Sequence, residues 1–200
     1  MSELTYSAGL VSQTFWFLEF KKTMTLLFEG KTSAEIKTLC LSGNIYGTAK
    51  EYRAKEIFNC MMRRVKMFDD EMIQYFNGAD LESQKLVNLI AILKYDRLFF
   101  EFLYEVYREK ILMGDYQIED TDVMIFFHKK GLQNEKVESM SESTQKKLKD
   151  KYFNFMKESG LLHIEGKVKK ITPPIPDPTL YRYLANRDDL AIIKAITGVN

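Results

Sequence analysis

The stretch STQKKLKDKYFNFMKESGLLHIEGKVKKITPP, residues 143–174, decides the fold of this chain. It begins with a lysine-rich helical pattern over 143–159, and Gly160 suits the position just beyond a helix end. Two short runs, 161–164 and 167–171, then flank a Glu165–Gly166 turn and predict a β-hairpin, which a stiff Pro173–Pro174 exit follows. This order is typical of the last helix and the wing of a winged helix-turn-helix, which offers both elements to a nucleic-acid groove.

Helical signals dominate the rest of the chain. Thr32–Glu35 and Thr48–Glu51 have the capping-box pattern that opens a helix, and Asp69 or Asp70 suits the start of another. Glycines at 30, 78 and 114 suit helix ends. We expect helices over 12–29, 32–41, 48–67, 69–76, 81–94, 96–113, 119–130, 143–159, 180–185 and 188–196, with a polar connector over 133–140.

The predicted fold class is therefore mainly α with one small hairpin. Gly114 is the best domain boundary, which gives a helical domain over 1–114, a winged-helix-like domain over 115–175 and a proline-rich exit with terminal helices over 176–200. In the simplest hairpin register, Leu162 and Ile164 fall opposite Lys167 and Lys169, so a bulge or a longer loop stays open.

The helix over 143–159 has one apolar face and one polar face. Its apolar stripe contains Leu148, Tyr152, Phe155 and Met156. The opposite side presents hydroxyl and ammonium groups, as a groove-facing helix requires. Those polar positions are Ser143, Lys146, Asp150 and Lys157, with Lys147 and Lys149 flanking them.

Positive charge is concentrated in this part of the sequence. Residues 143–171 hold eight lysines and three carboxylates, a local charge of about +5 in a chain whose formal charge is +1. Clustered cations release counterions from phosphates, which favours nucleic-acid binding; a solvated helix face followed by a lysine-decorated hairpin is the structural alternative. Because the stretch contains no arginine, it suits backbone contacts better than base discrimination. The predicted contact residues are Ser143, Lys146, Lys147, Lys149, Lys167, Lys169 and Lys170.

A second basic set lies on the helix expected over 48–67. Arg53, Arg63 and Arg64 are candidates to extend the nucleic-acid contact. Ion pairing with the nearby Glu51 and Glu56 is the structural alternative.

The sequence gives little indication of catalysis. Glycine-rich phosphate loops, GxSxG and HExxH are absent, and the two histidines, His128 and His163, have no metal-ligand spacing. Cys40 and Cys60 are predicted to be free, buried thiols in a reducing cytosol. There is no signal-peptide pattern, and no apolar run approaches the roughly 18 residues that a membrane span needs. We expect a cytoplasmic protein that is not an enzyme and that binds no metal, cofactor or membrane.

Several stretches together resemble the BrxA family of BREX bacteriophage-exclusion systems. The similarity rests on order and spacing along essentially the whole chain. Its elements are 6–10 (YSAGL), 27–33 (LFEGKTS), the break at Asn44, the helix carrying Arg53 and Arg63–Arg64, 97–102 (RLFFEF) and the ending 159–174.

The resemblance implies an N-terminal domain similar to the antitermination factor NusB, joined to a winged-helix-like domain. It implies binding to double-stranded DNA and a role in host defence beside a methyltransferase and other BREX proteins, without catalysis. Two alternatives remain open. One is a scaffold that docks other defence proteins, for which Phe153 and Met61–Met62 are candidate contacts, with burial in the core or between domains as the favoured structural alternative for these residues. The other is RNA binding by the NusB-like domain.

Overall fold

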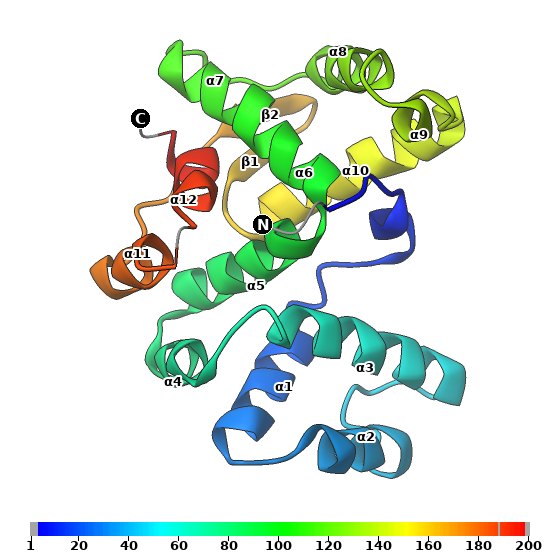
Figure 1. Ribbon diagram of the computed structural model, residues 1–200, viewed down its shortest axis with the longest axis vertical. Helices are drawn as coiled ribbons and strands as arrows, with labels where there is room; N and C mark the ends of the chain where they lie inside the picture. Colours follow the sequence, from blue (N-terminus) through cyan, green and yellow to red (C-terminus); the bar gives the residue numbers. More distant parts are fainter. Residues whose placement is uncertain (1–3, 188, 199–200) are drawn as a thin grey trace. The chain divides into compact units, whose positions relative to one another are not determined.

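The computed structural model describes residues 4–187 and 189–198, and these form two compact units (Figure 1). We call residues 16–91 the helical unit. Residues 4–15 together with 92–198 form the hairpin unit. The described chain is mainly helical and contains a two-stranded antiparallel sheet, as the sequence predicts.

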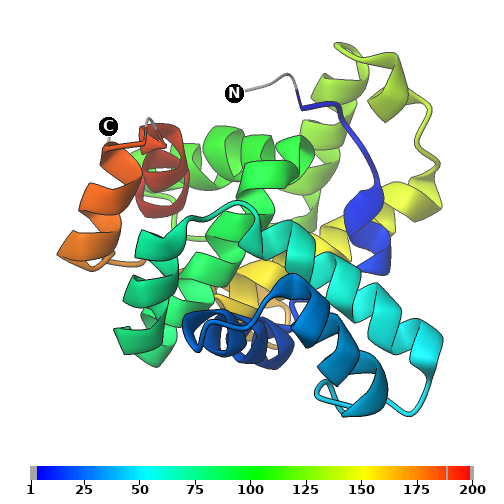
Figure 2. The same cartoon turned by 60° about the horizontal axis from the view of Figure 1, so that its bottom comes forward.

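The helical unit contains four whole helices and the start of a fifth. Figures 1 and 2 both show α2 beside α3. Phe20 of α1 meets Phe76 of α4 edge to face, with ring centroids 5.4 Å apart. The elements are α1 (Phe17–Phe28), α2 (Ser33–Ser42), α3 (Glu51–Val65), α4 (Asp70–Gly78) and α5 (Leu81–Tyr95), which enters the other unit at Ile92.

The hairpin unit is built on one long helix that changes its pitch. Its first and last parts are α6 (Arg97–Phe102) and α7 (Arg108–Leu112), and between them Leu103–Tyr107 (η2) forms a π-helical turn. The other elements are η1 (Gly9–Ser12), α8 (Asp120–Gly131), α9 (Glu135–Glu138), α10 (Glu142–Glu158), β1 (Leu162–Glu165), β2 (Val168–Ile171), α11 (Pro178–Ala185) and α12 (Leu190–Thr197).

An aromatic cluster around Tyr152 forms the core of the hairpin unit. The Tyr152 ring is fully buried and stacks on Phe99 at 4.6 Å and on Phe102 at 5.2 Å between centroids. Phe127 of α8 stacks on the same ring at 6.0 Å. Buried aromatic pairs of this kind stabilise a core beyond their area alone. The cluster therefore holds α10 against both α6 and α8.

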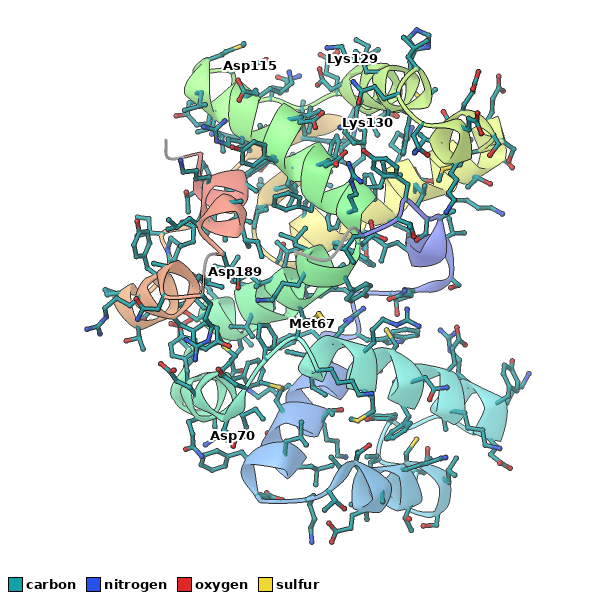
Figure 3. All side chains as sticks on the ribbon, in the orientation of Figure 1. Met67, Asp70, Asp115, Lys129, Lys130 and Asp189 are labelled. Atoms are coloured by element: carbon teal, nitrogen blue, oxygen red, sulfur yellow. The ribbon has the colours of Figure 1, made fainter. Side chains whose placement is uncertain are left out.

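A charged network fixes α8 on the long helix. Lys130, labelled in Figure 3, lies near the end of α8, and its ammonium is 2.5 Å from carboxylate oxygens of both Glu101 and Glu105. Glu101 also accepts hydrogen bonds from the Arg97 guanidinium and from the Tyr6 hydroxyl. Because Lys130 is buried, its charge requires these partners.

The hairpin has a two-residue turn, one position later than the sequence predicts. Leu162 pairs with Ile171 and Glu165 pairs with Val168, so Gly166 and Lys167 form the turn, and Gly166 has a φ of +59°. A two-residue turn with a positive φ matches the twist of the strands. No bulge interrupts the pairing of β1 with β2.

A segment before α8 also pairs with the hairpin, which the sequence did not indicate. The Ile118 amide donates to the Lys169 carbonyl, and the Ile171 amide donates to the Tyr116 carbonyl, at 3.0 and 2.8 Å. Gln117 forms an isolated antiparallel bridge with Lys170. Residues 116–118 thus lie along the edge of β2 that faces away from β1.

Several predicted helix starts are confirmed, those at Ser12 and Thr48 are wrong, and the start predicted at Asp188 lies outside the described residues. Thr32 forms a full capping box with Glu35, and Asp69 caps α4. Thr48 does not cap α3: the helix begins only at Glu51, with Lys50 at its N-cap, and the Thr48 amide donates to Asn44 Oδ1. The first helix begins at Phe17 rather than at Ser12, which closes the short 3₁₀ turn η1. The polar connector over 133–140 contains the short helix α9.

The contact units divide the chain elsewhere than the predicted boundary at Gly114. Residues 92–114 group with 115–198 because the long helix packs its aromatic residues on α8 and α10. The Phe102 ring, for example, meets the Phe126 ring edge to face at 5.4 Å.

Asp96 caps α6 from a buried position, which makes its ionisation costly. Its Oδ1 accepts from the Phe99 amide at 2.9 Å, and the residue is 5% exposed. Burial raises the pKa of Asp96 to about 6, although the amide bond opposes the shift. Folded Asp96 therefore holds its proton more strongly than an unfolded carboxyl with a pKa of about 3.9. Stability is lost as pH rises through this interval.

We predict that Asp96→Asn removes this pH dependence. Asparagine caps a helix as well as aspartate does and carries no charge. The unfolding free energy of the variant minus that of the unchanged protein should rise by about 2–3 kcal/mol between pH 4 and pH 8. Urea titrations at several pH values measure this difference. Asp70→Asn, which changes an exposed first-turn carboxylate, is the control, and a pH-independent difference for Asp96→Asn would contradict the prediction.

Candidate nucleic-acid interface

One side of α10 is exposed and polar, as the sequence predicts. Ser141 caps the helix, its hydroxyl accepting from the Thr144 amide. Leu148, Tyr152, Phe155 and Met156 are buried on the opposite side. Glu142 and Glu158, near the two ends of the helix, are also exposed. We call the following exposed positions the α10 strip: Ser143, Lys146, Lys147, Asp150, Asn154 and Lys157.

Phe153 does not point outward, contrary to its position on the predicted polar side. It is 6% exposed, and the Lys169 ammonium lies over its ring at 4.8 Å from the centroid. Strand β2 thus covers a flank of α10 that helical spacing alone leaves open. Phe153 is therefore a packing residue and not an exposed partner contact.

Asp120 forms ion pairs with two of the predicted contact lysines. It lies in the first turn of α8, where its Oδ1 is 2.8 Å from Lys169 Nζ, and its Oδ2 pairs with Lys149 Nζ. The side chains of Lys149 and Lys169 are only 13% and 19% exposed. The ammonium groups of Lys149 and Lys169 lower the pKa of Asp120.

These contacts change the role that we assign to Lys149 and Lys169. Each ammonium neutralises Asp120, so neither is available to a phosphate without giving up a carboxylate partner. The shared carboxylate joins α8, α10 and β2. Lys149 and Lys169 therefore position the hairpin on the helices.

The other two hairpin lysines remain exposed. Lys167 lies in the turn, and Lys170 is cross-strand partner to His163 on the outward face of the hairpin. His163 is exposed, and its Nε2 lies 2.9 Å from Glu165 Oε1. The turn and the outward face are thus the accessible basic part of the hairpin.

The exposed charge is more balanced than the sequence count suggests. With Lys149 and Lys169 bound to Asp120, the exposed lysines of α10 and the hairpin are Lys146, Lys147, Lys157, Lys167 and Lys170. Exposed carboxylates on the same elements are Glu142, Asp150, Glu158 and Glu165. The position of each lysine, more than the total charge, therefore decides what this surface can bind.

The arginines of the helical unit have three different environments. Arg53 pairs with Glu56 at 2.7 Å and its guanidinium lies 4.9 Å from the centroid of the Trp16 ring. Arg64 is completely buried and donates to Asn88 Oδ1 at 3.0 Å, so its prediction as a contact residue is wrong. Of these three arginines, Arg63 is the one whose side chain is exposed.

Within residues 4–187 and 189–198, no cluster of histidine, cysteine and carboxylate side chains is arranged to hold a metal ion. Cys40 and Cys60 are free and buried, and burial raises the pKa of both thiols. None of the described helices is long and apolar enough to cross a membrane.

Comparison with known proteins gives the family. The model of the BrxA family matches residues 4–188. A BREX protein BrxA from Bacillus cereus (strain H3081.97) is 38% identical over 175 residues, which is 88% of each chain. The chain belongs to the BrxA family. The resemblance inferred from the sequence is thereby confirmed.

A solved structure has the same overall fold as this BrxA-family chain. It is the crystal structure of an uncharacterized protein from Magnetospirillum magneticum, with a TM-score of 0.80. The match covers 97% of this chain and 99% of the other at 17% identity. At that identity the likeness concerns the fold alone.

We predict that Asp120→Asn loosens the hairpin of this BrxA-family chain. The substitution leaves two largely buried ammonium groups without their carboxylate, which should cost about 1–2 kcal/mol of unfolding free energy. Because folding lowers the pKa of Asp120, this stabilisation is present at pH values above the unfolded pKa of about 3.9. It is lost as the pH falls through the folded pKa.

Hydrogen exchange of the β1 and β2 amides measures the loosening directly. Exchange should accelerate in Asp120→Asn at pH 7, and the difference should shrink toward pH 3. Glu138→Gln, which changes an exposed carboxylate on α9, serves as the control. Unchanged exchange in Asp120→Asn would show that the hairpin does not depend on this carboxylate.

Proposed function

We propose that this protein acts in BREX phage defence as a non-enzymatic DNA-binding protein. It contacts double-stranded DNA through the α10 strip and the turn of the hairpin. Other BREX proteins are its expected partners, since the similar protein from Bacillus cereus is itself a BREX protein.

The order of paired elements in the hairpin unit carries this proposal. Residues 116–118 pair with β2; α8 and α10 follow them, and then the hairpin itself. The four-residue helix α9 lies in the connector between α8 and α10. Apart from it, a strand, two helices and two further strands in this order are the elements of a winged helix. The order supports a winged-helix-like domain over 115–175 within the hairpin unit. In this assignment α10 is the groove-facing helix and Gly166–Lys167 is the tip of the wing.

The dimensions and exposure of α10 suit a major groove. Its 17 residues span about 25 Å, and a helix with its side chains is about 10–12 Å wide, close to the roughly 12 Å of the groove. Lys146 and Lys147 lie in the first turns of the strip with Ser143. Asp150 follows them and repels phosphate, so the contact should concentrate on the N-terminal half of the helix.

The chemistry of the strip favours backbone contact over base recognition. Lysine ammonium groups are suited to phosphates, which fix position without carrying sequence information. Asn154 is the one amide of the α10 strip, and asparagine can pair with adenine edges. We therefore propose salt-sensitive binding with little sequence preference.

The helical unit has a separate place in the proposal. The similarity to NusB was proposed for residues 1–114, and the contacts of Arg53 and Arg63 lie within residues 16–91. RNA binding by this part of the chain is the alternative proposal. A competition between duplex DNA and structured RNA distinguishes binding by the helical unit from binding by the hairpin unit. Only binding by the hairpin unit should depend on the α10 lysines.

We predict that Lys146→Ala/Lys147→Ala weakens binding to duplex DNA. If the five exposed lysines of α10 and the hairpin contact phosphates, log Kd should change with log salt with a slope of about 4 to 5. Removing two contacts should lower the slope by about 2 and weaken binding roughly 10–100-fold at about 0.1 M salt. Fluorescence anisotropy with a labelled duplex measures both quantities.

Lys21→Ala/Lys22→Ala is the matched control, because it also removes two adjacent exposed lysines from a helix. Its affinity and slope should equal those of the unchanged protein. Equal effects of both double substitutions would reject α10 as the contact surface. Tighter binding to RNA that is insensitive to the α10 substitutions would favour the helical unit instead.

A further inference from the structure

The proline-rich segment between β2 and α11 presents an unusually exposed apolar side chain. Its sequence over 172–178 is TPPIPDP. Ile175 is 97% exposed, the highest value among the large apolar side chains that the structure describes. An isoleucine in water forgoes the stabilisation that burial would give it.

The backbone of this segment is extended and stiff. Thr172, Pro173, Ile175 and Asp177 each precede a proline, which restricts them to extended or polyproline II geometry. Each proline ring fixes its own φ near −65°. Asp177, with φ −52° and ψ 140°, has the expected geometry, and no regular secondary structure is assigned over 172–177.

Both ends of the segment are fastened to the hairpin unit. The Thr172 hydroxyl donates to the Gly160 carbonyl at 2.7 Å, and its amide donates to the Leu161 carbonyl at 3.0 Å. At the other end, Asp177 Oδ1 accepts from the Thr179 and Leu180 amides at 2.7 and 3.2 Å and caps α11. The segment is therefore anchored at both ends.

The exposed apolar side chains of the segment are Ile175 and Pro178, and Pro178 is the first residue of α11. Pro173, Pro174 and Pro176 are only partly exposed. A polyproline II backbone, with three residues per turn, would place Ile175 and Pro178 on the same face. The segment thus offers an apolar contact centred on Ile175.

The chemistry of the segment points to a protein partner rather than to nucleic acid. It contains no lysine or arginine, and Asp177 adds a negative charge, which disfavours a phosphate-lined groove. Its four prolines lack the amide hydrogens that strand pairing requires. Aromatic-lined grooves are the surfaces that recognise polyproline II ligands, and a preformed ligand loses little entropy on binding.

We infer that residues 172–178 are a docking motif, and that Ile175 inserts into an aromatic-lined groove on another protein of the same BREX system. This function is separate from DNA binding and would hold if the DNA proposal failed. Burial of the Ile175 side chain supplies most of the affinity, and the prolines supply the fixed backbone.

Binding of the full chain to the other proteins of its BREX system, each purified singly, tests the inference by biolayer interferometry. One of them should bind, and Ile175→Asp should weaken that binding at least tenfold. Leu132→Asp is the matched control, since Leu132 is 78% exposed in the same unit and should be neutral. A synthetic peptide of residues 171–179 should compete, and the same peptide with Ile175→Asp should not.

A second variant tests the fixed backbone while keeping the side chain. Pro174→Gly/Pro176→Gly should weaken binding several-fold through added chain entropy. The same added freedom of the unfolded chain should lower Tm, so binding is measured well below the Tm of the variant. Absence of binding by every BREX protein would overturn the inference. So would equal affinity of Ile175→Asp and the unchanged chain. A fall in DNA affinity on Ile175→Asp, without loss of protein binding, would assign the segment to DNA.

Discussion

The burial of Tyr152 among aromatic rings is the interaction on which the candidate interface depends. Its ring stacks on Phe99 and Phe102 of α6 and on Phe127 of α8, so it fixes both the position of α10 and its rotation about its own axis. Rotation decides which residues face solvent. Ser143, Lys146 and Lys147 are accessible because Tyr152 and Phe155 are not.

A second constraint is that a carboxylate of the protein competes with phosphates for the same lysines. Asp120 neutralises Lys149 and Lys169, which are distant from each other in sequence, and so converts two candidate phosphate contacts into structural ion pairs. A lysine-rich segment can therefore serve packing and binding at once. In the proposed function Lys147 contacts phosphate, whereas Lys149, only two positions later, holds the fold together.

Local features were the part of the fold that sequence reasoning predicted well. The capping box at Thr32, the Asp69 cap and the glycine after α10 each depend on residues within one turn of the helix end. The capping pattern at Thr48 was wrong: the Thr48 amide donates to Asn44 Oδ1, and α3 begins only at Glu51. The π-helical turn at Leu103–Tyr107 has no comparable signal, since its residues continue the same apolar pattern as α6.

The sequence by itself determined the family, the largely helical architecture, the hairpin and the polar side of α10, because these follow from spacing and from residue type along the chain. Only the tertiary structure decided that Arg64 is buried against Asn88, that β2 covers Phe153, and that residues 116–118 join the sheet. It also decided that Ile175 is left in water. Each of these depends on which distant segments meet, and helical or strand periodicity contains no information about a partner far away in the chain.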